Sequence, residues 1–173
     1  MVVNKGYLTA KTDKASDEYY TPREAVLHIL QYINPNTTVW CPFDDESSEY
    51  VKCLKEGGFK VIYSHIDEGK NFFYYEPEEP YDYIISNPPF SLKDDVLKRL
   101  NELGKPYAML LPLPTLQGQS RFPYLKDSEA LIFNKRINFW QDKEHTKMVK
   151  GVAFASIYIC KNVLPEKLIF EEL

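Results

Sequence analysis

The segment YDYIISNPPFSLKDDVLKRL, residues 81–100, contains the pattern that decides the fold. Its apolar run at 81–85 is typical of a buried strand, and the residues SNPPF at 86–90 follow at once. Helical spacing of apolar residues then begins, and it stops at Gly104. The segment therefore predicts a strand, a rigid turn and a helix, which form the repeating unit of an α/β sheet.

The same alternation continues on both sides of this segment. Helices are expected at 22–33, with Thr21 and Glu24 as a capping box, and at 47–56 and 92–103. Strands are expected at 38–43, 59–65, 71–75, 81–86 and 107–111. After Pro112, the expected strands at 130–133, 136–140 and 152–160 have no helices between them. The pattern predicts a doubly wound, mostly parallel sheet with an antiparallel hairpin at its far edge.

Composition limits the class of protein. The 173 residues are expected to form a flexible arm at 1–16 and one domain at 17–173. No stretch is apolar enough to span a membrane or serve as a signal peptide, so a cytoplasmic protein without membrane contacts is expected. The three cysteines form no C-x-x-C pair, so neither a disulfide framework nor a metal site is expected. The net charge of −4 weighs against tight non-specific DNA binding.

The turn at 87–90 has the chemistry of an amine-binding site. In open α/β sheets, ligands bind at the carboxyl ends of the strands, where this turn is expected. Asn87 supplies an amide and Pro88 a conformationally restricted carbonyl, so together they can accept both hydrogens of an exocyclic amine. Phe90 can stack on the heterocycle that carries the amine. The dipeptide Asn-Pro by itself is explained by a rigid turn without a ligand. The four residues 87–90 together, placed directly after a buried strand, favour amine binding.

Asn87-Pro88-Pro89-Phe90 resembles the (N/D/S)-P-P-(Y/F/W) motif of S-adenosylmethionine-dependent methyltransferases, in particular that of the adenine-N6 group of DNA methyltransferases. The resemblance extends over roughly 17–160. It implies a Rossmann-like methyltransferase fold, with a mostly parallel seven-stranded sheet and an antiparallel edge hairpin that includes 152–160. It also implies S-adenosyl-L-methionine as cofactor and the four motif residues as the catalytic group.

The resemblance implies a set of cofactor-binding residues as well. The segment 20–22 is similar to the one that lies near the methionine part of the cofactor, and 41–43 resembles the start of the loop after the first strand. Residues 65–67 occupy the place of the ribose contact, and 71–72 that of the adenine contact. The implied residues are Tyr20, Thr21, Pro22, Cys41, Pro42, Phe43, His65, Asp67, Asn71 and Phe72.

The loop at 41–47 departs from the family pattern because it contains no glycine and has three carboxylates. This departure leaves open a degenerate methyltransferase fold that serves as a binding or regulatory module. Methylation of a protein glutamine also stays open, because glutamine methyltransferases have a similar N-P-P-Y motif. For the enzyme, the resemblance implies nucleic acid as partner, with DNA favoured over RNA. Only 114–127 and 141–150 remain for target recognition, so loose sequence specificity, a single-stranded or RNA substrate, or a partner protein that supplies recognition is expected.

Overall fold

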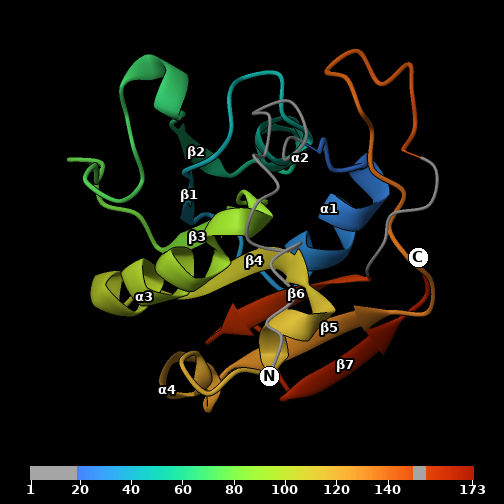
Figure 1. Ribbon diagram of the computed structural model, residues 1–173. Coiled ribbons are helices and arrows are strands. Elements are labelled where there is room, and N and C mark those ends of the chain that lie inside the picture. The colour runs from blue at the N-terminus through green and yellow to red at the C-terminus, as the bar shows by residue number, and fades with distance from the viewer. Residues whose placement is uncertain (1–18, 150–154) are drawn as a thin grey trace, which may run out of the picture.

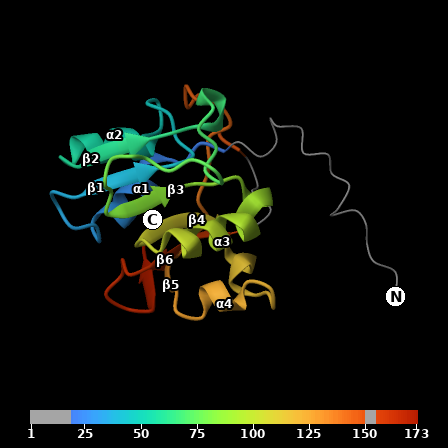
Figure 2. The ribbon, with the colours of Figure 1, turned by 90° about the vertical axis from the view of Figure 1, so that its left-hand side faces the viewer.

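The computed structural model of the protein describes residues 19–149 and 155–173. Within these ranges, seven strands form one sheet (Figure 1). In chain order they are β1 (Thr38–Cys41), β2 (Lys60–Tyr63), β3 (Tyr83–Ser86), β4 (Tyr107–Pro112), β5 (Glu129–Phe133), β6 (Ser156–Lys161) and β7 (Leu168–Glu171). Across the sheet the order is β2-β1-β3-β4-β6-β5-β7, and Figure 2 shows the strands descending in this order from β2 to β5.

Neighbouring strands pair in parallel except at β6, which runs antiparallel to both β4 and β5. The expected fold class, a mostly parallel Rossmann-like α/β sheet with an antiparallel pair, is therefore confirmed. The antiparallel strand lies one position further inside than expected, because β7 pairs with β5 and forms the edge. The sequence analysis missed β7, a four-residue strand that alternates between exposed and half-buried positions. The expected arm at 1–16 lies outside the described residues.

Helices flank the sheet and define a switch point in its connections. They are α1 (Arg23–Leu30), α2 (Glu49–Glu56), α3 (Lys93–Leu103) and α4 (Phe122–Leu125), with short 3-10 turns η3 (Ile66–Glu68), η4 (Phe90–Leu92) and η5 (Leu113–Leu116). The crossover through α2 runs from β1 to β2, whereas that through α3 runs from β3 to β4 in the opposite direction. Because such crossovers are right-handed, α2 and α3 lie on opposite faces, α2 beside α1 and α3 beside α4 (Figure 1). The switch between β1 and β3 is where α/β sheets bind ligands.

The core surrounds the central strands. Both β3 and β4 are buried along their whole length, which explains their continuous apolar sequences. Tyr50 of α2 and Tyr158 of β6 join their hydroxyl groups at 2.8 Å within this core and tie the helix to the sheet. No helix within the two described ranges is long and apolar enough to cross a bilayer.

Two of the expected strands are wrong. Residues 71–75 form turns in which the N–H groups of Tyr74 and Tyr75 donate to the carbonyl of Asn71. Residues 136–140 make only an isolated bridge at Trp140, which pairs with Tyr20 and Met148. Aromatic residues of both segments pack against the end of the sheet. The apolar character of these segments therefore reflects burial and not strand formation.

The expected capping box at the start of α1 does not form. Pro22 occupies the N-cap position, and no side chain caps the helix. The hydroxyl of Thr21 lies near that of Tyr50, but it makes no hydrogen bond of ordinary geometry within the described residues. Thr21 is therefore turned toward the interior at the end of the sheet rather than toward the helix backbone.

A buried carboxylate holds the turn between β6 and β7. Glu129 is 9% exposed, and its oxygens accept hydrogen bonds of 2.8–3.0 Å from the backbone N–H groups of Asn162, Val163 and Leu164. Asn162 has φ 54°, so the turn begins in the left-handed region. The carboxylate satisfies donors that this conformation turns away from the sheet.

Replacing Glu129 with alanine should lower the free energy of unfolding by about 2–4 kcal/mol, because three backbone N–H donors lose a charged acceptor. Urea unfolding followed by circular dichroism measures the change. Glu166→Ala removes an exposed carboxylate from the same turn and should change stability by less than about 0.5 kcal/mol. Equal, small losses in both variants would contradict the anchoring role of Glu129.

Candidate functional site

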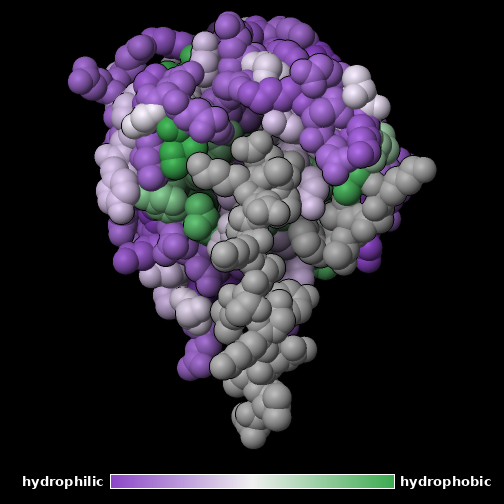
Figure 3. Space-filling view, turned by 45° about the horizontal axis from the view of Figure 1, so that its top comes forward, coloured by the Kyte–Doolittle hydropathy of each residue, from purple (hydrophilic) through white to green (hydrophobic). Residues whose placement is uncertain are grey.

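A cavity of about 520 Å³ opens at the carboxyl ends of β1, β2 and β3; it is called the main cavity below. Its walls come from residues 19–21, 42–50, 65–73 and 87–92, and from Lys143 and His145. Figure 3 looks obliquely onto this end of the molecule, where hydrophilic residues dominate and hydrophobic atoms are visible in hollows between them. All the site residues expected from the sequence line the main cavity except Pro22 and Cys41.

Asn87 presents an unsatisfied acceptor at the wall of the main cavity. Its Nδ2 donates to the backbone carbonyl of Tyr19 at 3.1 Å, which determines the orientation of the amide because a carbonyl accepts only from a donor. Its Oδ1 is buried and has no hydrogen-bond partner among the described residues. An unpaired buried acceptor costs about 1–3 kcal/mol, so a ligand that donates to this oxygen gains affinity.

The remainder of the motif forms a rigid wall. Pro88 is buried and Pro89 half-buried, and η4 begins directly after them. Phe90 is 8% exposed, and its ring packs edge-on against Phe139 at 6.3 Å between ring centroids. Much of the Phe90 ring is thus occupied by the core, and less of it is open for stacking than the sequence suggested.

Cys41 and Pro22 are the two expected site residues that do not line the main cavity. Cys41 is the last residue of β1, and its side chain is fully buried beside the core, where burial raises the pKa of the thiol. The side chains of a strand alternate between its faces, so the position at the strand end does not by itself point into the cavity. Pro22 lines a shallow neighbouring groove with Trp140 and Met148.

The segment after β2 forms the far wall of the main cavity. His65 accepts a hydrogen bond at Nδ1 from the N–H of Asp67, whose own side chain is 79% exposed. Asn71 uses Oδ1 to accept from the N–H of Phe73, so this oxygen stabilises the turn. Phe72 is 2% exposed, whereas Phe73 is half-buried and offers the more accessible ring.

Phe43 connects this wall to the loop after β1. Its ring lies 4.9 Å from that of Phe72, which in turn lies 5.5 Å from Trp40 of β1. Phe43 is half-buried, so part of its ring is open to the main cavity. The aromatic residues at this side form a continuous apolar surface that is suited to a flat ring.

Asp44 has a place in the site that the sequence did not reveal, since there it was only one carboxylate of the glycine-free loop. Asp44 is 8% exposed, lines the main cavity, and accepts hydrogen bonds from Ser48 at 2.5 Å and from Ser86. Ser48 is the N-cap of α2, and Ser86 directly precedes Asn87. The carboxyl of Asp44 thus links the loop after β1 to the end of β3, the two strands on either side of the switch point. In the sequence, Ser86 at the end of an otherwise apolar strand indicated that this strand end contacts a polar group.

Burial raises the pKa of the Asp44 carboxyl from 3.8 to about 6, although the hydrogen bonds from Ser48 and Ser86 and the charge of His65 lower it. Its neighbour Asp45 behaves differently. Partial burial is outweighed there by hydrogen bonds from Lys143 and Ser47, which lower the pKa of Asp45 to about 2. Of these two neighbouring carboxyl groups at the main cavity, Asp44 has the raised pKa and Asp45 the lowered one.

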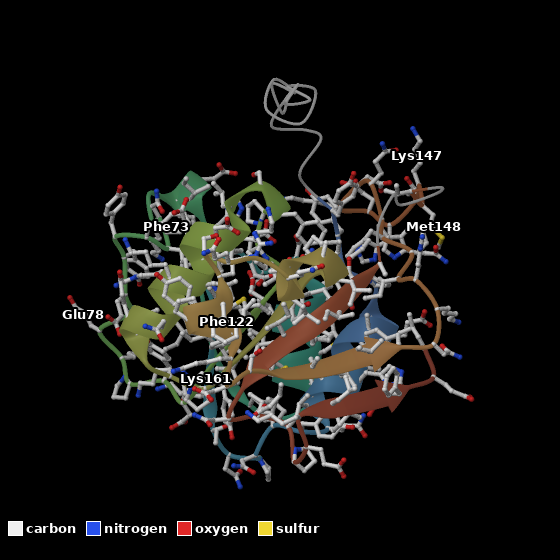
Figure 4. All side chains as sticks on the ribbon, turned by 60° about the horizontal axis from the view of Figure 1, so that its bottom comes forward. Phe73, Glu78, Phe122, Lys147, Met148 and Lys161 are labelled. Carbon is white, nitrogen blue, oxygen red and sulfur yellow. The ribbon has the colours of Figure 1, made fainter. Side chains whose placement is uncertain are left out.

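The segment 139–149 covers one side of the main cavity as a hairpin. Backbone hydrogen bonds join Gln141 to Lys147 and Val149 to Phe139, and Lys143 forms an ion pair with Asp45 at 2.6 Å. Lys147 projects outward from this hairpin, beside Met148 (Figure 4). The hairpin includes the described part of the expected recognition region at 141–150, and its residues Lys143 and His145 line the main cavity.

The other expected recognition region, 114–127, is held together internally. The guanidinium of Arg121 donates to the carbonyls of Thr115 and Gln117 and forms an ion pair with Asp94 at 2.9 Å. Arg121 therefore stabilises its own loop, which limits its capacity to contact a substrate. Phe122 is 66% exposed and remains open to a partner from this region (Figure 4).

Within the described part of the chain, no group of three His, Cys, Asp or Glu side chains could hold a metal ion. No family model and no curated protein matches the sequence. Among solved structures, the 23S rRNA methyltransferase ErmE is similar over 86% of this chain and 71% of its own, with 12% identity and a TM-score of 0.49. A candidate methyltransferase from Thermoplasma acidophilum is similar over 83% and 74%, with 9% identity and a TM-score of 0.42. At such values the function has to be argued from the site.

The pKa of Asp44 predicts a pH-dependent stability. Because its folded pKa of about 6 exceeds the unfolded 3.8, Asp44 contributes stability below pH 4 that is lost as the pH rises through 6. Asp44→Asn removes this dependence, so its free energy of unfolding relative to wild type should rise by about 2 kcal/mol from pH 4 to pH 7. Urea unfolding of both proteins at several pH values measures this difference, and a difference that is constant with pH would contradict the buried, near-neutral carboxyl.

Proposed function

We propose that the protein is an S-adenosylmethionine-dependent methyltransferase that methylates an exocyclic amine of a nucleobase, with adenine N6 of DNA as the favoured target. The observation that carries this proposal is the unsatisfied Oδ1 of Asn87 at the wall of the main cavity. An amine hydrogen satisfies this acceptor without rearrangement of the amide, because Nδ2 already has a partner in Tyr19.

The main cavity fits a cofactor of this kind. Its volume of about 520 Å³ lies within the range of roughly 300–1,000 Å³ that is usual for small-molecule sites. Phe43 and Phe73 offer apolar surface for an adenine ring, and His65 and Asp67 supply polar groups at the rim for a ribose. Tyr20 and Thr21 line the side next to Asn87, so the amino-acid part would lie there. When bound, the cofactor supplies an electrophilic methyl group on its sulfonium.

The residues of the motif then act by positioning. Asn87 Oδ1 and the carbonyl of Pro88 accept the two amine hydrogens, which directs the nitrogen lone pair away from the motif and toward the cofactor side of the cavity. The same two oxygens would stabilise the positive charge on the nitrogen as its bond to the methyl carbon forms, while the bond from that carbon to the sulfonium sulfur breaks and its electron pair stays on the sulfur of the leaving S-adenosylhomocysteine. The methylated nitrogen then releases a proton to solvent, so no strong base is required.

The hairpin at 139–149 supports a large substrate. It places Lys143 and His145 beside the main cavity, with Lys147 further out on the same segment. A base reaches the motif only if it is unstacked, since the motif lies at the wall of a cavity. Only the segments 114–127 and 141–149 of the described residues were left by the sequence for target recognition, which supports a single-stranded region as target or recognition by a partner protein.

Asn87→Ala should lower the rate of methyl transfer by about 10²- to 10³-fold, because it removes the group that orients the amine and stabilises its charge. The affinity for S-adenosylmethionine should change less than about threefold, since the amide faces the amine rather than the cofactor. Transfer of labelled methyl groups to separate DNA, RNA and protein pools measures the rate, and calorimetry measures the affinity. Asn101→Ala, on the exposed face of α3, is the matched control and should retain full activity.

The pools separate the proposal from its alternatives. Label in N6-methyladenine that disappears with Asn87→Ala supports the proposal, and the pool that takes the label identifies DNA or RNA. Label in protein glutamine would favour the glutamine methyltransferase. Absence of cofactor binding at millimolar concentration would leave the degenerate binding module, for which the glycine-free loop at 41–47 already argues.

A further inference from the structure

Asp44 is a buried carboxyl at the wall of the main cavity for which the transfer chemistry above has no use. It is 8% exposed, and its oxygens accept from the hydroxyls of Ser48 and Ser86. These hydroxyls are neutral donors, and no lysine or arginine of the described residues forms an ion pair with Asp44. Lys143 of the hairpin forms an ion pair with Asp45. The carboxylate of Asp44 therefore lacks a full counter-charge.

A second, independent feature points to a ligand at the same place. The hydroxyl of Thr21 is buried, lines the main cavity, and makes no hydrogen bond of ordinary geometry. Thr21 is 6% exposed and lies near Tyr50, a residue that also lines the cavity. An uncompensated carboxylate and an unsatisfied hydroxyl in one cavity suit a ligand that carries both a cation and hydrogen-bonding groups.

Building on the proposed function, we propose that the carboxylate of Asp44 is the counter-charge for a cationic group of the bound cofactor, its ammonium or its sulfonium. The Asp44 side chain makes a contact with the cofactor that the backbone of the glycine-free loop is poorly suited to make. Pro42 has no backbone N–H, and Phe43 places a side chain where a glycine would leave the backbone open. A carboxylate attracts the cation without requiring such a close approach of the backbone.

The proposal implies that binding is linked to a proton. The charged groups that face Asp44 are Asp45 in its own loop and His65 after β2, and the neutral hydroxyl groups of Tyr50 and Tyr158 lie on α2 and β6. Only the ionised carboxyl attracts a cation, so protonation competes with the ligand. Affinity is full above a pH of about 6 and falls as the pH decreases through that value.

Calorimetric titration of the purified protein tests this with three ligands from pH 5 to pH 8. S-adenosylmethionine has both cations, S-adenosylhomocysteine has only the ammonium, and 5′-methylthioadenosine has neither. Asp44→Asn should weaken the binding of S-adenosylmethionine by about 10- to 100-fold at pH 7.5, because a charge-assisted contact is lost. The affinity of the same variant for 5′-methylthioadenosine should stay within about twofold of the wild-type affinity. A loss that extends to S-adenosylhomocysteine assigns the contact to the ammonium, whereas a loss confined to S-adenosylmethionine assigns it to the sulfonium.

The controls separate this role from folding and from neighbouring groups. Asp127→Asn removes the same charge from an exposed loop after α4 and should bind all three ligands as wild type does. Ser86→Ala retains the carboxylate but removes one of its donors, so the pH at which affinity falls should move upward. His65→Gln should retain the inflection, because the proton is on Asp44.

Three results would overturn the inference. The first is equal affinity of wild type and Asp44→Asn for S-adenosylmethionine. The second is a loss of affinity for 5′-methylthioadenosine in Asp44→Asn that is as large as the loss for S-adenosylmethionine. The third is the disappearance of the inflection in the pH dependence of affinity in His65→Gln, which would show that the proton linked to binding is on His65. In each case the proposed function would survive, since the wild type still binds the cofactor. Absence of binding by the wild type at every pH would overturn both together.

Discussion

The parallel pairing of β1 with β3 is the constraint on which the rest of the site depends. Val39 pairs with Tyr83 and Trp40 with Ile84, so the two strands end side by side at the switch point of the sheet. Residues more than forty positions apart in the chain are thereby brought into contact, as the hydrogen bond from Ser86 to Asp44 demonstrates. Sheet hydrogen bonds hold this register, and a shift by one residue would turn the polar ends toward the wrong face.

Asn87 and Asp44 are two of the polar groups at this end of the sheet that are poorly satisfied within the protein. The Oδ1 of Asn87 has no partner among the described residues, and Asp44 is buried with neutral donors only. Each lowers the stability of the fold, and neither is required by the packing of the core. Both lie at the wall of one cavity, so a ligand with an amine and a cation would compensate them together. Such a local cost is expected where function rather than folding selects the residue.

The loop after β1 achieves its shape without glycine. The N-cap serine of α2 connects to Asp44, and Asp45 connects to Lys143 of the hairpin, so side-chain bonds hold the loop. Phe43 packs on Phe72 and fills the space that a flexible backbone would leave. The loop is therefore rigid through its contacts rather than through the turn geometry that glycine permits. The wall that this loop gives to the main cavity therefore does not depend on glycine.

The sequence by itself determined the strand, turn and helix around residues 81–103, the alternation that makes the sheet parallel, and the placement of the 87–90 motif at a strand end. These features depend on local periodicity and on the restricted backbone of proline. Only the tertiary structure decided that Asp44 rather than Cys41 faces the cavity and that Arg121 is occupied by its own loop. It also decided that the antiparallel strand enters between β4 and β5. These outcomes depend on side-chain direction and on contacts between distant segments, which no local pattern encodes.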